Sequence, residues 1–280
     1  MGSNTSKILR LTPTKTETGR TIPQDIINEI TDHLATDRGF KLRTLRACAL
    51  ISKSWVQPCR RHLFHTVYFT LRNMSRWFKI FSVPEESPAH HVKDLHIWIG
   101  GGGCIPERFF EYTQWFANAE RMTLLGHGGV PPPRRIPLWR LPQSVTSLII
   151  DASAVTLVQV RDIMTQLPNL DNLSLSGDPA TINRRVLPGI GTALRGRFGG
   201  KLILSDEYAS EDVIKMLLEI PSGLHFTEVQ VCCNRKSLLS DIGLAEACAK
   251  TLVKLSYTVT PLCKFLPLPL DTNTDAVSSV

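Results

Sequence analysis

Residues 145–150 read VTSLII, and the pattern of this hexapeptide recurs through the second half of the chain. Apolar residues stand at its first, fourth and sixth positions, which is typical of a short strand with one buried face. The fourth position returns at intervals of 25 to 29 residues. Its occurrences are Leu95, Met122, Leu148, Leu173, Leu202, Val229 and Leu255. A strand that returns at so regular a spacing predicts a stack of similar units.

The segments between these strands carry apolar residues at helical spacing, most clearly in residues 107–119, 155–167 and 211–220. Three prolines stand just before strands, where a helix must stop: Pro142, Pro168 and Pro221. The period and the strand signature resemble leucine-rich repeats, in which each unit needs its neighbours to bury its apolar side. Only Asn234 supplies the asparagine that follows the strand in such repeats, so we expect an irregular stack. An ordinary α/β domain is the alternative.

The chain between residues 22 and 64 has the pattern of three short helices. Pro23 suits a first helical position, and Ile26, Ile30 and Leu34 follow it at four-residue spacing. A second apolar stripe runs from Leu42 to Ile51, and a third short helix is expected near residues 57–64. A three-helix unit this small rarely buries all its apolar residues, which predicts an exposed apolar patch.

This segment resembles an F-box. The family pattern has a Leu-Pro opening, an acidic and aliphatic first helix, a Leu-x-x-Leu-x-x-small second helix, a Ser-x-x-Trp step and a bulky terminal pair. The matching residues are Ile22, Pro23, Ile26, Ile27, Ile30, Leu34, Leu42, Leu45, Cys48, Ile51, Ser52, Trp55, Leu63 and Phe64. The chain departs from the pattern in Ile22, where Leu is usual, and in Asp25 and Ile26, where Glu and Leu are common. The segment is most similar to F-box proteins of mushroom-forming fungi.

The resemblance implies a substrate-recognition adaptor of a Skp1-cullin-F-box (SCF) ubiquitin ligase, which marks targets for ubiquitin-dependent degradation. The helices would bind a Skp1-like adaptor, and through it a cullin, while the leucine-rich repeats present an unknown target protein. The implied Skp1-binding residues are Ile22, Pro23, Ile26, Ile27, Ile30, Leu45, Ile51 and Trp55. The resemblance implies neither an enzyme nor a cofactor. The alternatives are helices that only begin a larger core, a repeat scaffold outside any ligase, and an enzyme with scattered catalytic residues.

The positive charge of the chain is concentrated in its first half. Residues 1–140 hold 20 basic and 11 acidic residues, whereas residues 141–280 hold 12 basic and 14 acidic ones. Such a basic segment attracts nucleic acid, an acidic protein or anionic lipid. Because no row of aromatic residues is interleaved with these charges, we do not expect nucleic-acid binding.

The sequence as a whole predicts an α/β fold, with a three-helix F-box followed by an irregular leucine-rich-repeat solenoid that has a parallel sheet. The expected parts are a flexible arm (1–20), a helical domain (21–67), a connecting segment (68–90), the repeats (91–265) and a flexible tail (266–280). Seven cysteines without a signal peptide favour the cytosol or the nucleus, and no apolar stretch is long enough to cross a bilayer.

Gly2 lies in a myristoylation pattern with Met1 and Ser6, on an arm that carries several basic residues. Attachment to a membrane is therefore expected only if Gly2 is acylated. Cys59, His62 and His65 have the spacing of metal ligands, but no fourth donor follows, so we expect no metal site. No nucleophile elbow, zinc-binding helix or paired carboxylates occur, which leaves no catalytic constellation.

Overall fold

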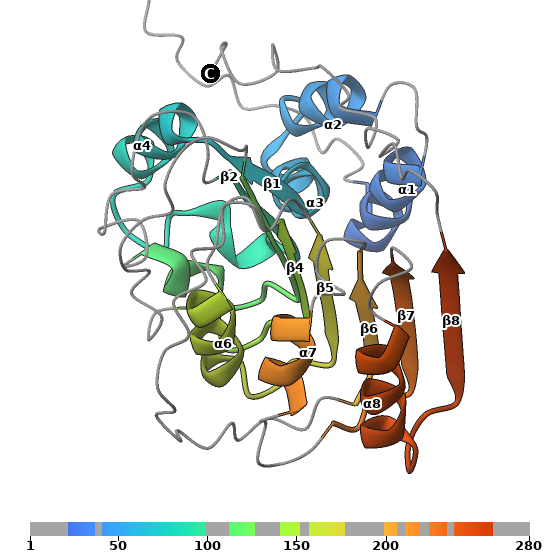
Figure 1. Ribbon diagram of the computed structural model, residues 1–280. Coiled ribbons are helices and arrows are strands. Elements are labelled where there is room, and N and C mark those ends of the chain that lie inside the picture. Colours follow the sequence, from blue (N-terminus) through green and yellow to red (C-terminus); the bar gives the residue numbers. More distant parts are fainter. Residues whose placement is uncertain are drawn as a thin grey trace, which may run out of the picture. The chain divides into compact units, whose positions relative to one another are not determined.

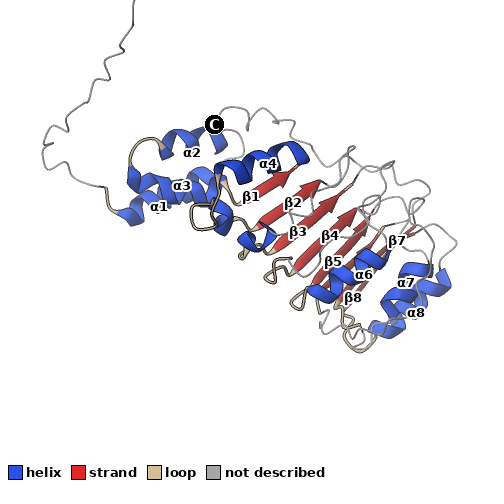
Figure 2. Cartoon of the chain, turned by 90° about the vertical axis from the view of Figure 1, so that its left-hand side faces the viewer, coloured by secondary structure: helices blue, strands red, loops and turns tan. Residues whose placement is uncertain are grey.

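The computed structural model (Figure 1) describes residues 22–36, 41–98, 112–126, 141–151, 157–176, 199–205, 211–218, 224–233 and 238–259. The chain divides into two compact units, Met1–His62 and Leu63–Val280. The first unit is built from helices, and the second around one parallel sheet (Figure 2). The expected α/β class is confirmed. The predicted arm with Gly2 and the predicted tail at residues 266–280 lie outside the described residues.

The helices of the first unit are α1 (Gln24–Thr36), α2 (Lys41–Ala49) and α3 (Lys53–Leu63). On α1, Ile27 and Thr31 lie four residues apart, hence on one face, and both are buried. Among the described residues of this unit, Leu45 of α2 and Trp55, Pro58 and Cys59 of α3 are also buried. These helices occupy the segment in which three short ones were expected, and α3 begins at Lys53 rather than near Gln57.

The second unit contains eight parallel strands that lie in the sheet in the order in which they occur in the chain. They are β1 (Thr66–Phe69), β2 (Asp94–Trp98), β3 (Arg121–Leu125), β4 (Ser147–Asp151), β5 (Asn172–Ser176), β6 (Lys201–Leu204), β7 (Glu228–Cys233) and β8 (Lys254–Val259). The seven periodic residues predicted from the sequence are register partners of one another across β2 to β8. The solenoid-like stacking that the period indicates is therefore present.

The core of this unit lies on one face of the sheet. Strand side chains alternate between the two faces, so that in β4, for example, Leu148 and Ile150 are buried while Ile149 is not. Figure 1 shows helices over this face. They are α6 (Leu157–Gln166), α7 (Glu211–Leu218) and α8 (Leu238–Cys248). Each contributes buried residues to the same core as the strands, which is why each repeat depends on its neighbours.

A repeated hydrogen-bond pattern aligns the strands where they begin. At β2, the His65 carbonyl accepts from the N–H groups of Lys93 and Asp94 at 2.9 and 3.0 Å, and the pattern is the same at β8. At β6 it changes: Gly200 N–H still bonds to the Asp171 carbonyl, but the Asn172 side chain accepts from Lys201 N–H at 2.9 Å. A Cβ on Gly200 would lie 2.7 Å from the Asp171 carbonyl oxygen, so this joint requires glycine.

The sheet begins earlier than expected. The segment 68–90, predicted to be a connection, contains the end of β1, the helix α4 (Leu71–Ile80) and the 3-10 helix η1 (Pro88–His91). The prediction missed β1 because Phe64, which begins the repeat spacing completed by Val67 and Phe69, was assigned to the helical domain. Of the helix expected over residues 107–119, the described part is the 3-10 helix η2 (Thr113–Phe116). Asn234 and Pro221 lie outside the described residues.

Candidate functional site

Helix α1 exposes aliphatic side chains on a flank beside its buried face. Ile26 and Ile30 lie four residues apart and are exposed, whereas their neighbours Ile27 and Thr31 are buried. Ile22, just before the helix, is also exposed. An α-helix turns about 100° per residue, so adjacent isoleucines face different surroundings. One side of α1 therefore packs in the unit and the other offers apolar surface to a partner.

The connection between α2 and α3 exposes two more large aliphatic side chains. Leu50 is 87% exposed and Ile51 is 65% exposed. The backbone holding them is ordered, because Leu50 N–H bonds to the Ala47 carbonyl at 3.1 Å and Ile51 N–H to the Cys48 carbonyl at 3.0 Å. A turn fixed in this way presents the two side chains with little loss of conformational entropy on binding.

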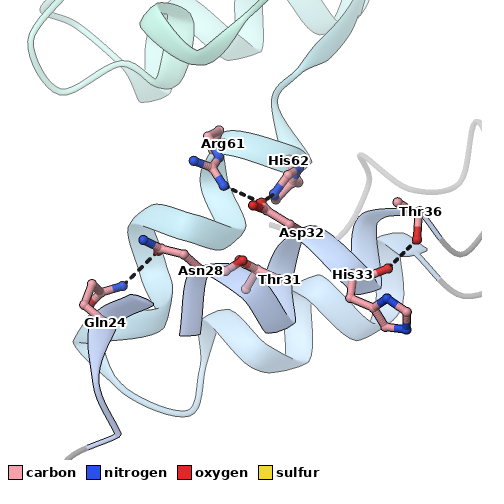
Figure 3. Close-up of polar contacts among 8 residues, drawn as sticks. All are labelled: Gln24, Asn28, Thr31, Asp32, His33, Thr36, Arg61 and His62. Atoms are coloured by element: carbon pink, nitrogen blue, oxygen red, sulfur yellow. Dashed lines mark hydrogen bonds and ion pairs between the residues drawn. The ribbon is translucent and has the colours of Figure 1, made fainter. Parts of the chain in front are cut away.

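Gln24 ties the start of α1 to the start of α3. Pro58 has no N–H, so the Ser54 carbonyl, four residues earlier in α3, lacks its usual helical partner. The Gln24 Nε2 group donates to this carbonyl at 3.2 Å. It also donates to Asn28 Oδ1 at 3.2 Å, a bond that Figure 3 shows. This bond brings the beginning of α1 beside the segment that follows Ile51. We call Ile22, Pro23, Ile26, Ile30, Leu50 and Ile51 the aliphatic surface.

A polar cluster ties the other end of α1 to α3. Asp32 forms an ion pair with Arg61, and the same Oδ1 atom accepts a hydrogen bond from His62 Nε2 at 2.7 Å (Figure 3). Desolvation by itself raises the pKa of Asp32, but the hydrogen bonds from His62 and Arg61 outweigh it and lower the pKa below its ordinary value. The ionised form of Asp32 therefore stabilises the packing of these two helices.

The structure separates the predicted Skp1-binding residues into two groups. Five of them are exposed and belong to the aliphatic surface: Ile22, Pro23, Ile26, Ile30 and Ile51. The other three, Ile27, Leu45 and Trp55, are buried, and the role we can assign them is packing of the unit rather than direct contact. Leu50 and Leu42 are exposed but were not among the predicted residues. Their only signal in the sequence is apolar character near the ends of α2.

Acidic and basic residues lie on different helices of the helical unit. Helix α1 holds three acidic residues and no lysine or arginine, whereas α2 and α3 hold lysine and arginine and no acidic residue. The side chains of Arg43, Lys53 and Arg61 are exposed on α2 and α3. Since Arg61 pairs with Asp32, Arg43 and Lys53 are better placed to meet an acidic partner.

The outward face of the sheet is the second candidate binding surface. On β1 and β2 the rings of Tyr68 and His96 are stacked, with centroids 4.3 Å apart. Burial lowers the pKa of His96, although nearby Asp94 opposes this shift, so the ring is neutral at neutral pH. Charged pairs cross neighbouring strands, as between Asp94 Oδ1 and Arg121 Nη1 at 3.1 Å. This face combines aromatic and charged groups, a mixture common in protein interfaces.

In the part of the chain that the structure describes, no three His, Cys, Asp or Glu side chains are grouped so as to hold a metal ion. Of the candidate ligands, Cys59 is buried, and desolvation followed by the nearby Cys48 raises the pKa of its thiol. A thiol kept protonated in this way is a poor metal ligand and a poor nucleophile. His62 is instead engaged with Asp32.

Within the described ranges, no helix is both long enough and apolar enough to cross a membrane. No family model and no curated protein matches the chain. The aliphatic surface of the helical unit and the outward face of the sheet are two candidate binding surfaces among the described residues.

Proposed function

We propose that the chain is the substrate-recognition adaptor of a Skp1-cullin-F-box ubiquitin ligase. In this proposal the helical unit is an F-box that binds a Skp1-like adaptor, and through it a cullin. The sheet unit is a degenerate leucine-rich-repeat domain that binds the target protein. The chain itself performs no chemistry, because ubiquitin transfer is carried out by other subunits. Its contribution is to hold the target near those subunits and so raise the effective concentration of the reactants.

The observation that carries this proposal is the exposure of Ile26 and Ile30 on a helix whose adjacent face is buried. An apolar helix face left in water is unfavourable, and an apolar groove of a partner removes it from water. Each fully buried isoleucine contributes about 1.5 to 3 kcal/mol. The aliphatic surface also extends past α1 to Leu50 and Ile51, so several side chains can act together as a binding core.

The charges beside the aliphatic surface indicate what kind of partner fits it. Arg43 and Lys53 are exposed on the two helices that carry no acidic residue. A partner with an apolar groove and acidic groups at its rim matches this arrangement. We therefore expect the affinity for Skp1 to fall as salt is added, because exposed charges are screened.

The decisive experiment replaces exposed isoleucines of α1 with glutamate. In the full chain, I26E/I30E is expected to weaken binding to purified Skp1 at least about 100-fold, the loss of roughly 3 kcal/mol of apolar burial. Surface plasmon resonance measures the affinity. The matched control is I80E, since Ile80 is an exposed isoleucine on a helix of the sheet unit. The control variant should bind Skp1 as the unchanged chain does.

Two outcomes contradict the proposal. If the unchanged chain does not bind Skp1, the helical unit is not an F-box, and a repeat scaffold outside a ligase becomes the better explanation. If I26E/I30E and I80E bind Skp1 equally well, the docking surface is assigned to the wrong residues. Circular dichroism shows whether the variants keep their helices, and hence whether the loss of binding reflects lost contacts.

A further inference from the structure

Helix α4 carries a row of cations on the side that faces away from the core. Met74 is 3% exposed and belongs to the core of the sheet unit, and Phe78 packs against the same core. At about 100° per residue, Arg72, Arg76 and Lys79 lie roughly 140 to 160° around the helix from Met74. All three side chains are exposed. We call Arg72, Arg76 and Lys79 the basic ridge.

The position of α4 is fixed by its cap and by its inner side. The Thr70 side chain accepts from Asn73 N–H at 3.4 Å, and the Asn73 side chain accepts from Thr70 N–H at 2.8 Å. Asn73 Nδ2 also donates at 2.8 Å to the carbonyl of Tyr68 in β1, beside which Figure 2 shows α4. On the inner side, the ring of Trp77 meets Phe69 edge-on with centroids 5.4 Å apart. The helix therefore presents its cations in a constant direction.

The basic ridge differs from the other cations of the sheet unit in its acidic neighbours. Three partly exposed cations on or just before the strands pair with an acidic side chain from the neighbouring repeat: Lys93 with Glu120, Arg121 with Asp94 and Lys201 with Glu228. Helix α4 contains no acidic residue. Among the residues that the structure describes, neither Arg72 nor Lys79 forms an ion pair. Arg76 has an interaction within the chain, so the ridge can engage a partner most freely through Arg72 and Lys79.

The placement of the cations does not favour the folding of α4. Arg72 lies in the first turn, where the N–H groups form the positive end of the helix dipole and a cation is unfavourable. Arg72 and Arg76 are four residues apart, and like charges at this spacing repel each other. An acidic residue in place of Arg72 would stabilise the helix better. The ridge is therefore better explained by a negatively charged partner than by the stability of α4.

We propose that the basic ridge binds an acidic segment of a partner protein. The ridge runs about 10 Å along the helix, with steps of about 6 Å from Arg72 to Arg76 and about 4.5 Å on to Lys79. In an extended peptide, alternate side chains share a side and lie about 7 Å apart. Aspartates or glutamates at alternate positions can thus pair with successive cations. Exposed ion pairs are individually weak, so several have to act together.

A narrow acidic segment fits this surface better than an anionic membrane does. Glu85 and Glu86 follow α4 within a few residues, and both are exposed. A lipid surface meets a broad area of a protein, and acidic side chains so near the ridge in the chain weaken its attraction to anionic headgroups. The basic ridge and the aliphatic surface belong to different units, so this inference does not depend on binding to Skp1.

The test measures binding of a fluorescein-labelled oligoglutamate peptide to the full chain at low salt by fluorescence anisotropy. The variant R72E/K79E should weaken binding at least about fivefold, because two attractive pairs become repulsive. The matched control is K250E/K254E, which makes the same change in net charge at two exposed lysines near β8, at the other end of the sheet. The control variant should bind the peptide as the unchanged chain does.

Two further measurements separate lost contacts from lost structure. Hydrogen exchange of residues 71–80 shows whether α4 stays folded in R72E/K79E. The variant R72Q/K79Q removes the two charges without reversing them, and it should weaken binding by an intermediate amount. Binding of R72E/K79E to purified Skp1 should equal that of the unchanged chain, because the ridge lies outside the helical unit.

The proposal is overturned if the unchanged chain does not bind the peptide. It is also overturned if R72E/K79E and K250E/K254E weaken binding equally, because the affinity then follows net charge rather than the ridge. A third outcome identifies a different occupant. If vesicles of phosphatidylcholine and phosphatidylserine bind the unchanged chain more tightly than the peptide does, and R72E/K79E abolishes that binding, the ridge binds lipid and the assignment to an acidic segment is wrong.

Discussion

The two units differ in how far their aliphatic side chains are buried. In the sheet unit, the periodic rows from β1 to β7 are buried, and alternate residues point outward. In the helical unit, adjacent residues differ in burial: Ile26 is exposed and Ile27 is buried. Aliphatic side chains of this unit therefore remain in contact with water. Strands β2 to β7 each have a neighbouring strand on both sides, whereas β1 and β8 are the edges of the sheet.

This difference follows from size and connectivity. A unit of three short helices has a high ratio of surface to volume and cannot enclose all its apolar side chains. A stack of repeats encloses them unit by unit, so that in the two periodic rows of the described strands exposure is confined to β8. Apolar surface therefore remains on the helical unit, where we infer that another protein covers it.

The largest expected effect lies in the middle of the sheet. Leu148 is fully buried between β3 and β5, and Leu148→Ala should lower the free energy of unfolding of the sheet unit by about 3 to 5 kcal/mol. Ile149→Ala, on the outward face of the same strand, should cost about 1 kcal/mol or less. Hydrogen exchange of peptides from β4, followed at increasing urea concentrations, measures the change in the free energy of unfolding for both variants. Equal losses of stability in the two variants would show that the two faces of β4 do not differ in burial.

A smaller effect is expected for the adjacent isoleucines of α1. Ile27→Ala should destabilise the helical unit by about 2 to 4 kcal/mol, because it leaves a cavity in the small core. Ile26→Ala should change stability by less than about 0.5 kcal/mol, yet weaken binding to Skp1. Hydrogen exchange of residues 24–36 reports the stability. The comparison fails if Ile26→Ala destabilises α1 as strongly as Ile27→Ala does.

The smallest effect concerns the pH dependence of the helical unit. The pKa of Asp32 is lowered in the folded chain from its ordinary value of 3.8, so the unfolded chain binds the proton more tightly. The stabilisation is therefore complete above about pH 5 and is lost as the pH falls below 4 through the lowered pKa. Asp32→Asn should flatten this part of the profile of hydrogen exchange against pH for residues 24–36. An unchanged slope between pH 5 and pH 3 would remove Asp32 from this role.

Much of the sheet unit was predictable because single apolar residues recur along the sequence at a nearly constant spacing. The positions from Leu95 to Leu255 were predicted as one row and are register partners in the sheet. β1 was missed although Phe64, Val67 and Phe69 have the spacing of the repeat, because Phe64 was assigned to the helical domain. The hydrogen bond from Gln24 to the Ser54 carbonyl was not predictable, because it joins residues thirty positions apart.

The amino-acid sequence by itself determined the period of the strands, the three N-terminal helices and the concentration of positive charge in the first half. These features are local, or repeat at a fixed spacing, so each can be recognised without knowing what packs against what. Only the tertiary structure decided that Ile26 is exposed and Ile27 buried, and that Leu255 lacks the cover that Val229 has. Burial depends on which neighbours reach a side chain, and two residues of the same type differ only in those neighbours.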